Sequence, residues 1–109
     1  MTSVTFHTEE SRITGFDAAG HSGYAEAGAD IVCAAVTSAV RLTEATVNEV
    51  LGLCASVKVD ERSGTISFRL PGGLSPTAEA ACQALMTGLM VYLAELHGEY
   101  PDNIEVLEA

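Results

Sequence analysis

One histidine and one cysteine lie close together in the sequence, where a loop is expected to lead into a helix. The segment reads Gly20-His21-Ser22-Gly23-Tyr24-Ala25-Glu26-Ala27-Gly28-Ala29-Asp30-Ile31-Val32-Cys33. If Asp30 caps the helix, Cys33 takes its third position, where unpaired backbone N–H groups and the positive end of the helix dipole favour a thiolate. The glycines of the loop would let His21 fold back and accept the thiol proton. This pattern is typical of a nucleophile and its general base.

Taken singly, each of these residues has a simpler interpretation. A lone cysteine in an apolar helix is more often core packing than a nucleophile, and a glycine-rich loop more often marks a tight turn. The loop matches neither the GxGxxG nor the Walker phosphate-binding pattern. Only the conjunction of thiol, histidine and capping carboxylate favours nucleophilic chemistry. Cys54 and Cys82 are expected to be core or lining residues, and no ligand spacing indicates a metal site or a cofactor.

The elements that must position this pair follow from hydrophobic periodicity and from turn residues. Strands alternate apolar and polar residues, helices repeat apolar residues every three or four positions, and Ser75 with Pro76 marks a helix start. The order ββαββαβ predicts an α+β fold in which two long helices pack on one face of a roughly five-stranded mixed sheet, all within a single domain spanning 1–109. The predicted strands are 2–7, 12–18, 57–60, 66–70 and 104–107, and the predicted helices run from Asp30 to about Leu51 and from Pro76 to about His97.

The charge balance indicates which classes of molecule the protein is expected to bind. Five basic residues stand against fifteen acidic ones, for a net charge of −10. Such a surface repels phosphate backbones and anionic lipid, so neither nucleic acid nor a membrane is the expected partner, whereas a basic protein would be attracted. Three widely spaced cysteines and an N-terminus without a leader pattern favour a reducing, cytoplasmic location.

Two blocks of sequence carry a family resemblance. Phe16–Ala25 followed by Gly28–Val36 resembles the ribosomal-processing cysteine proteases called Prp, whose signature is close to GHxGYAxxGxDIVCAAV. The resemblance implies a small cytoplasmic bacterial homodimer. It also implies an activity, removal of the N-terminal extension of the basic large-subunit ribosomal protein numbered twenty-seven, with cleavage after an aromatic residue in a short apolar motif.

The resemblance also implies a reaction and roles for five residues. The chemistry is acyl transfer through a thioester, and backbone N–H groups at the helix start, that of Cys33 included, are expected oxyanion donors. No third triad member is identified. The implied nucleophile is Cys33 and the general base is His21; Gly20 gives the loop its freedom, Asp30 caps and orients, and Thr37 stands where relatives usually carry serine.

Two other functions remain open from the sequence. One is a non-catalytic acidic adaptor that holds a basic ribosomal protein, with Cys33 merely packed. The other is a cysteine hydrolase or transferase that acts on a different acyl substrate. Charge alone does not separate these from the protease.

Overall fold

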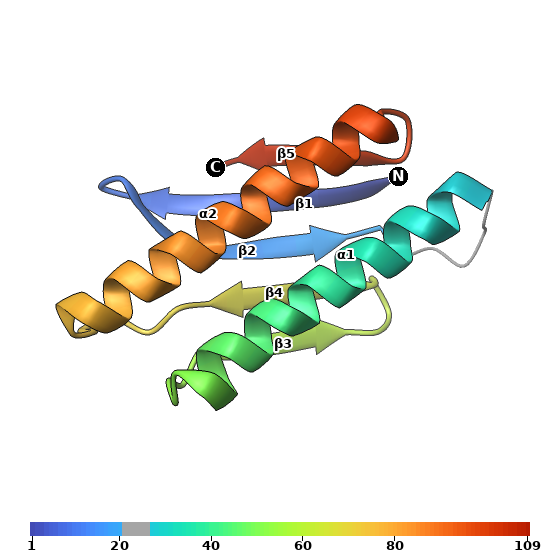
Figure 1. Cartoon of the computed structure of the whole chain (residues 1–109). Coiled ribbons are helices and arrows are strands. Elements are labelled where there is room, and N and C mark those ends of the chain that lie inside the picture. The colour runs from blue at the N-terminus through green and yellow to red at the C-terminus, as the bar shows by residue number, and fades with distance from the viewer. Residues whose placement is uncertain (21–26) are drawn as a thin grey trace.

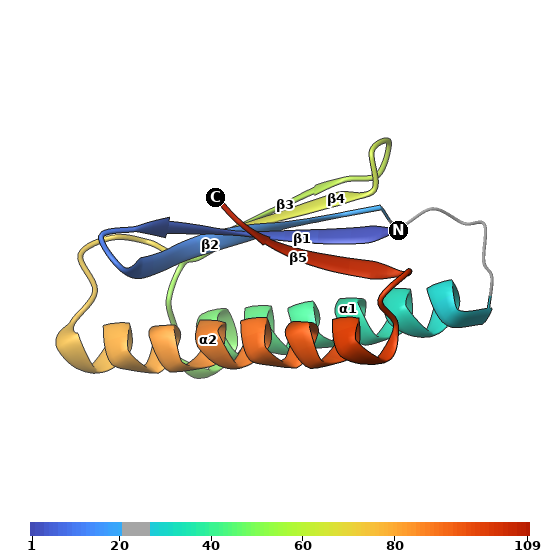
Figure 2. The same ribbon diagram turned by 90° about the horizontal axis from the view of Figure 1, so that it is seen from above.

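The computed structural model describes residues 1–20 and 27–109, with the backbone alone for 27–30. Two layers make up the described part: a five-stranded sheet and two long helices that run side by side across one of its faces (Figures 1 and 2). This confirms the predicted fold class. In chain order the elements are β1 (Thr2–Glu9), β2 (Arg12–Ala19), α1 (Ala27–Ala45), a π-helical turn (Thr46–Val50), β3 (Ser56–Asp60), β4 (Thr65–Arg69), α2 (Pro76–Glu99) and β5 (Ile104–Glu108).

The sheet has the order β3-β4-β2-β1-β5. Both hairpins are antiparallel, and β5 pairs in parallel with β1 at one edge, which makes the sheet mixed. The first two strands run one or two residues longer than predicted because the connecting turn is tight, with Glu10 and Ser11 at φ 49° and 66°.

Aromatic rings from three strands form the centre of the core. Phe6 pairs with Phe16 and Phe16 with Phe68 across the sheet, and the Phe16 and Phe68 rings stack at 5.1 Å between centroids. Strand alternation turns these rings toward the helices. The helices cover them with fully buried apolar side chains from α1 and α2, among them Val32, Val36, Val40, Cys82, Met86 and Leu93.

Hydrogen bonds hold helix α2 in place at its start, along its length and near its end. Ser75 caps it, since the Ser75 hydroxyl accepts from the Ala78 N–H at 3.2 Å, as predicted. Further along, the side-chain amide of Gln83 bonds both backbone groups of Ile13, each at 2.8 Å. Near the end, His97 Nδ1 donates to the Ile104 carbonyl at 2.6 Å, which ties α2 to β5.

Helix α1 differs from the prediction at both ends. It begins at Ala27, three residues before Asp30, although Gly28 is a poor helix former. Asp30 therefore lies in the first turn and is not the cap. Regular α-helix ends at Ala45, and a π-helical turn follows, closed by the bond from Leu51 N–H to the Thr46 carbonyl. The Thr46 hydroxyl also donates back to the Leu42 carbonyl at 2.8 Å.

Among the described residues, neither helix is long and apolar enough to cross a membrane.

Candidate active site

Gly20 fixes the point where the chain leaves the sheet on its way to His21. It follows the end of β2, where Ala19 lies opposite Ser3 of β1. Its φ of +94° belongs to the left-handed region, and a Cβ at this position would collide with the carbonyl oxygen of Met1. Only glycine fits both conditions. His21 itself lies outside the described residues, so its predicted approach to the thiol stays a prediction.

Cys33 lies on the flank of α1 and not on its buried stripe. Its neighbours Val32 and Val36 are fully buried, whereas the Cys33 side chain is half-buried. One turn further, Thr37 presents its side chain on the same flank. Because α1 starts at Ala27, Cys33 is the seventh helical residue. Its N–H is then bonded within the helix, and the expectation that this N–H serves as an oxyanion donor is wrong.

A groove of about 330 Å³ opens beside this thiol. One wall is α1 and the other is the β3–β4 hairpin. The walls are largely apolar, and the volume is at the lower end of the ~300–1,000 Å³ typical of ligand pockets. The lining residues are Cys33, Thr37, Val59, Asp60, Glu61, Gly64 and Ile66.

Two carboxylates form the hairpin end of this groove. Asp60 Oδ1 accepts the N–H groups of Arg62 at 3.0 Å and Ser63 at 3.3 Å, which fixes its orientation in the turn. Within the described ranges, none of the ion pairs involves Asp60 or Glu61. The groove thus combines a thiol, apolar walls and negative charge. The hairpin residues were not predicted from the sequence as part of the site, although the strands 57–60 and 66–70 that form the hairpin were predicted.

The other two cysteines occupy different environments. Cys82 is fully buried in α2, as predicted; burial raises the pKa of its thiol, the Glu79 charge raises it further and Arg12 opposes them. Cys54 is exposed, so its prediction as a core or lining residue was wrong. Gly52, at φ +69°, ends the helical segment and redirects the chain outward just before it.

A second histidine has a carboxylate partner, but on the opposite face of the sheet. His7 Nε2 lies 2.7 Å from Asp17 Oδ2, and Arg69 Nη2 lies 3.1 Å from Asp17 Oδ1. Burial alone would raise the pKa of Asp17, but hydrogen bonds with Ser67 and His7 and the charge of Arg69 outweigh it and lower the pKa. Since Phe16 and Ala18 face the helices, Asp17 points away from Cys33.

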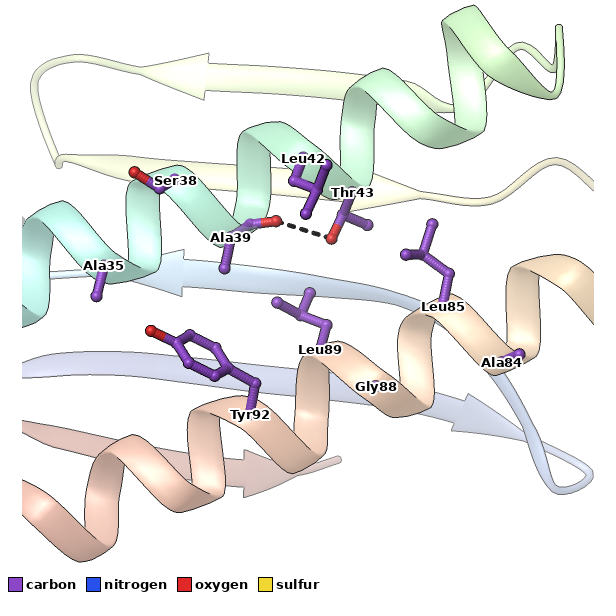
Figure 3. Close-up of a pocket in the computed structure, with 10 residues that line it drawn as sticks. All are labelled: Ala35, Ser38, Ala39, Leu42, Thr43, Ala84, Leu85, Gly88, Leu89 and Tyr92. Atoms are coloured by element: carbon purple, nitrogen blue, oxygen red, sulfur yellow. Dashed lines mark hydrogen bonds between the residues drawn. The ribbon is translucent and has the colours of Figure 1, made fainter.

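A second, wholly uncharged groove of about 520 Å³ runs between α1 and α2 (Figure 3). Leu42 and Tyr92 reach into it and are 66% and 42% exposed. Its Thr43 hydroxyl already donates to the Ala39 carbonyl at 2.9 Å, and apart from the hydroxyls of Thr43, Ser38 and Tyr92 the lining side chains are apolar. Across the described part of the chain, no three His, Cys, Asp or Glu side chains gather as a metal site.

Comparison with known proteins gives consistent matches over nearly the whole length. A family model described as "Cysteine protease Prp" matches residues 1–105. The ribosomal processing cysteine protease Prp of Bacillus subtilis (strain 168) is 32% identical over 99 residues, which cover 91% of this chain and 88% of that protein.

Solved structures match the fold equally well. The essential ribosomal processing protease Prp from S. aureus in complex with a substrate peptide superposes with a TM-score of 0.85 at 20% identity, over 100% of both chains. The S. aureus protease with a covalently linked product peptide superposes with a TM-score of 0.77 at 23% identity, again over 100% of both chains.

Proposed function

The chain belongs to the Prp family of ribosomal-processing cysteine proteases, and we propose that it removes the N-terminal extension of the large-subunit ribosomal protein numbered twenty-seven. In this proposal Cys33 is the nucleophile and His21 the general base. One observation carries it: Cys33 opens into a groove large enough for a peptide side chain, whereas the buried Cys82 does not.

The chemistry is acyl transfer in two stages. The Cys33 thiolate attacks the scissile carbonyl, and the bond to the leaving nitrogen breaks as His21 protonates that nitrogen. Water then adds to the thioester with His21 as base, which releases the new carboxyl end and restores the thiol. A covalently linked product peptide in the S. aureus structure fits such an intermediate. Because the Cys33 N–H is bonded within α1, the oxyanion must be stabilised by other donors.

Three further residues have supporting roles in this proposal. Gly20 sets the direction in which the chain leaves β2 and so where His21 starts. Thr37 offers a hydroxyl on the same side of α1 as the thiol. Asp30 belongs to the first turn of α1, and its proposed role is to stabilise the start of the helix that carries Cys33, because acidic residues are favourable in a first turn.

The same proposal includes a cytoplasmic homodimer without a nucleic-acid or membrane partner. Two copies that each carry a net charge of −10 repel one another, so they meet most easily through an uncharged face. The groove between α1 and α2 is such a face, and the exposed Leu42 side chain is part of its lining. Sedimentation equilibrium of the unmodified protein and of Leu42→Glu tests this proposal. The unmodified protein should be a dimer and Leu42→Glu a monomer, and a monomer in both cases would contradict the proposed dimer.

The experiment on function compares three proteins on one peptide. The peptide spans the extension and the start of the mature ribosomal protein from the same genome. The unmodified chain and Cys54→Ala are expected to cleave it equally, since Cys54 lies outside the groove. Cys33→Ala should be at least about a thousandfold slower. Cleavage by all three, or by none, overturns the assignment, and a panel of unrelated thioesters tests the rival acyl substrate.

A further inference from the structure

The two edges of the sheet are covered to different degrees. At the β5 edge, Ile104 is fully buried beneath the helix layer. At the β3 edge, all five residues of the strand are exposed. The exposed edge strand is therefore also the strand that forms a wall of the groove beside Cys33.

The apolar side chains of β3 point toward the helices but are not covered by them. Val57 lies opposite Phe68 and Val59 opposite Ile66, so both valines share the helix-facing side with the buried Phe68 ring. Val57 is nevertheless 36% and Val59 63% exposed. Within the part of the chain that the structure describes, the helices therefore do not bury these two valines.

Figures 1 and 2 show the same arrangement in the ribbon. Helix α2 crosses the sheet obliquely over β2 and β1 toward β5, whereas the β3–β4 hairpin forms the opposite side, next to the half of the layer occupied by α1. The lining of the groove runs from Val59 and Ile66 on the hairpin to Thr37 and Cys33 on the helix. The exposed side chain of Val59 and the thiol of Cys33 therefore line the same groove.

We propose that an extended apolar segment of the substrate binds beside β3 as an added strand, places one apolar side chain between Val59 and α1, and so presents its scissile carbonyl to Cys33. An edge strand offers a row of N–H and C=O groups to such a segment. Alternate side chains of an added strand face the same side, so one in two turns toward the groove. This inference rests on the proposed function, because it gives the binding mode of that substrate.

A second copy of this chain is a poorer occupant of the edge. Self-pairing of two β3 strands about their midpoint would set Lys58 against Lys58, and like charges opposite one another destabilise a strand pair. A peptide from a basic protein instead meets the carboxylates of Asp60 and Glu61 at the hairpin end of the groove. The charge pattern therefore favours the substrate segment.

The first experiment measures binding apart from cleavage. A short fluorescein-labelled peptide spanning the extension is titrated with the Cys33→Ala protein, and each peptide nitrogen is methylated in turn. An added strand donates at every second residue, so N-methylation should weaken binding about 3- to 10-fold at alternate positions and little between them. Weakening without this alternation, or a peptide that does not bind, overturns the proposal.

The second experiment tests the uncovered valine. In the Cys33→Ala background, Val59→Thr keeps the shape of the side chain but makes it polar, and should weaken binding about fivefold. Val50→Thr is the matched control, because Val50 is 76% exposed and lies beyond the other end of α1. Equal affinity of both variants overturns the proposal, and so does a change in oligomeric state with unchanged peptide affinity.

The two proposals fail in different ways. If the unmodified chain cleaves the peptide but the methylation series shows no alternation, the added strand is wrong and the proposed function stands. If the series alternates but the unmodified chain does not cleave, the function is wrong and the docking mode stands.

Discussion

The two halves of the helix layer pack on the same sheet, but the half under α2 is closed and the half beside α1 is open. Under α2 the sheet is closed: Gln83 is bonded to Ile13, His97 to Ile104, and Arg12 to Glu79 at 2.7 Å. Beside α1 the β3–β4 hairpin leaves a groove and an uncovered edge strand. The difference teaches that both helices pack on the sheet, but α2 closes its half, whereas α1 leaves the flank that carries Cys33 open to a groove.

The largest expected difference between the halves is in thiol reactivity. Cys82 is buried and its pKa is raised, so its thiol stays protonated and reacts only when α2 opens. Iodoacetamide should label Cys82 on the order of a thousandfold more slowly than Cys33 or Cys54, as followed by mass spectrometry, with Cys33 the fastest. Comparable labelling of Cys82 in the folded protein would show that the α2 half is not closed.

Truncation of the core under α2 is the next largest effect. Leu93 is fully buried, and Leu93→Ala should lower the free energy of unfolding by about 3 kcal/mol in urea titrations followed by circular dichroism. Val91→Ala on the same helix is the control, since Val91 is half exposed and its truncation should cost under about 0.5 kcal/mol. Equal losses in the two variants would contradict the packing described for α2.

A substitution at Gly20 should lower both the stability and the activity of the protein. Gly20→Ala forces a Cβ against the Met1 carbonyl in a left-handed conformation, at a cost of about 2 kcal/mol, and it redirects the chain before His21. Peptide cleavage by the folded fraction is then expected to fall at least about tenfold. Gly72→Ala is the matched control because a Cβ there meets open space. Unchanged cleavage by Gly20→Ala would contradict the proposal that Gly20 positions His21.

The smallest effect concerns the sheet face opposite the groove. The lowered pKa of Asp17 means that its charge stabilises the folded state above the ordinary value of 3.8, and that this stabilisation is lost as the pH falls through the lowered pKa. Asp17→Asn should therefore be less stable than the unmodified chain at about pH 7, with the difference shrinking toward about pH 2. Asp102→Asn, on an exposed turn, should show no such trend, and cleavage of the peptide should be unaffected in both.

Local sequence signals predicted the elements but not all of their limits. Ser75 with Pro76 placed the start of α2, and alternation placed the β3–β4 hairpin. The helix start predicted at Asp30 was wrong because an aspartate is favourable both at the cap and within the first turn of a helix, and here it lies within that turn. The π-helical turn was missed because its apolar residues continue the spacing of α1.

Only part of the candidate site could be predicted from the sequence. The Cys33 block could be identified because its residues are neighbours in the chain. The groove could not, since it depends on how far α1 covers the hairpin, and the apolar pattern of Val57 and Val59 is the same whether they are buried or open. Strand order was likewise hidden, because nothing local to β5 indicates that it joins β1.

The parallel pairing of β1 with β5 joins residues that are about a hundred positions apart, as in the 2.6 Å bond from the Ser3 hydroxyl to Glu105 Oε1. During synthesis, β1 must therefore wait for residues 104–108 to emerge before that flank can close. Contacts of such long sequence separation slow folding. Maturation of this enzyme is thus tied to late translation, and the newborn chain passes through a stage in which β1 is open to pairing with the wrong neighbour.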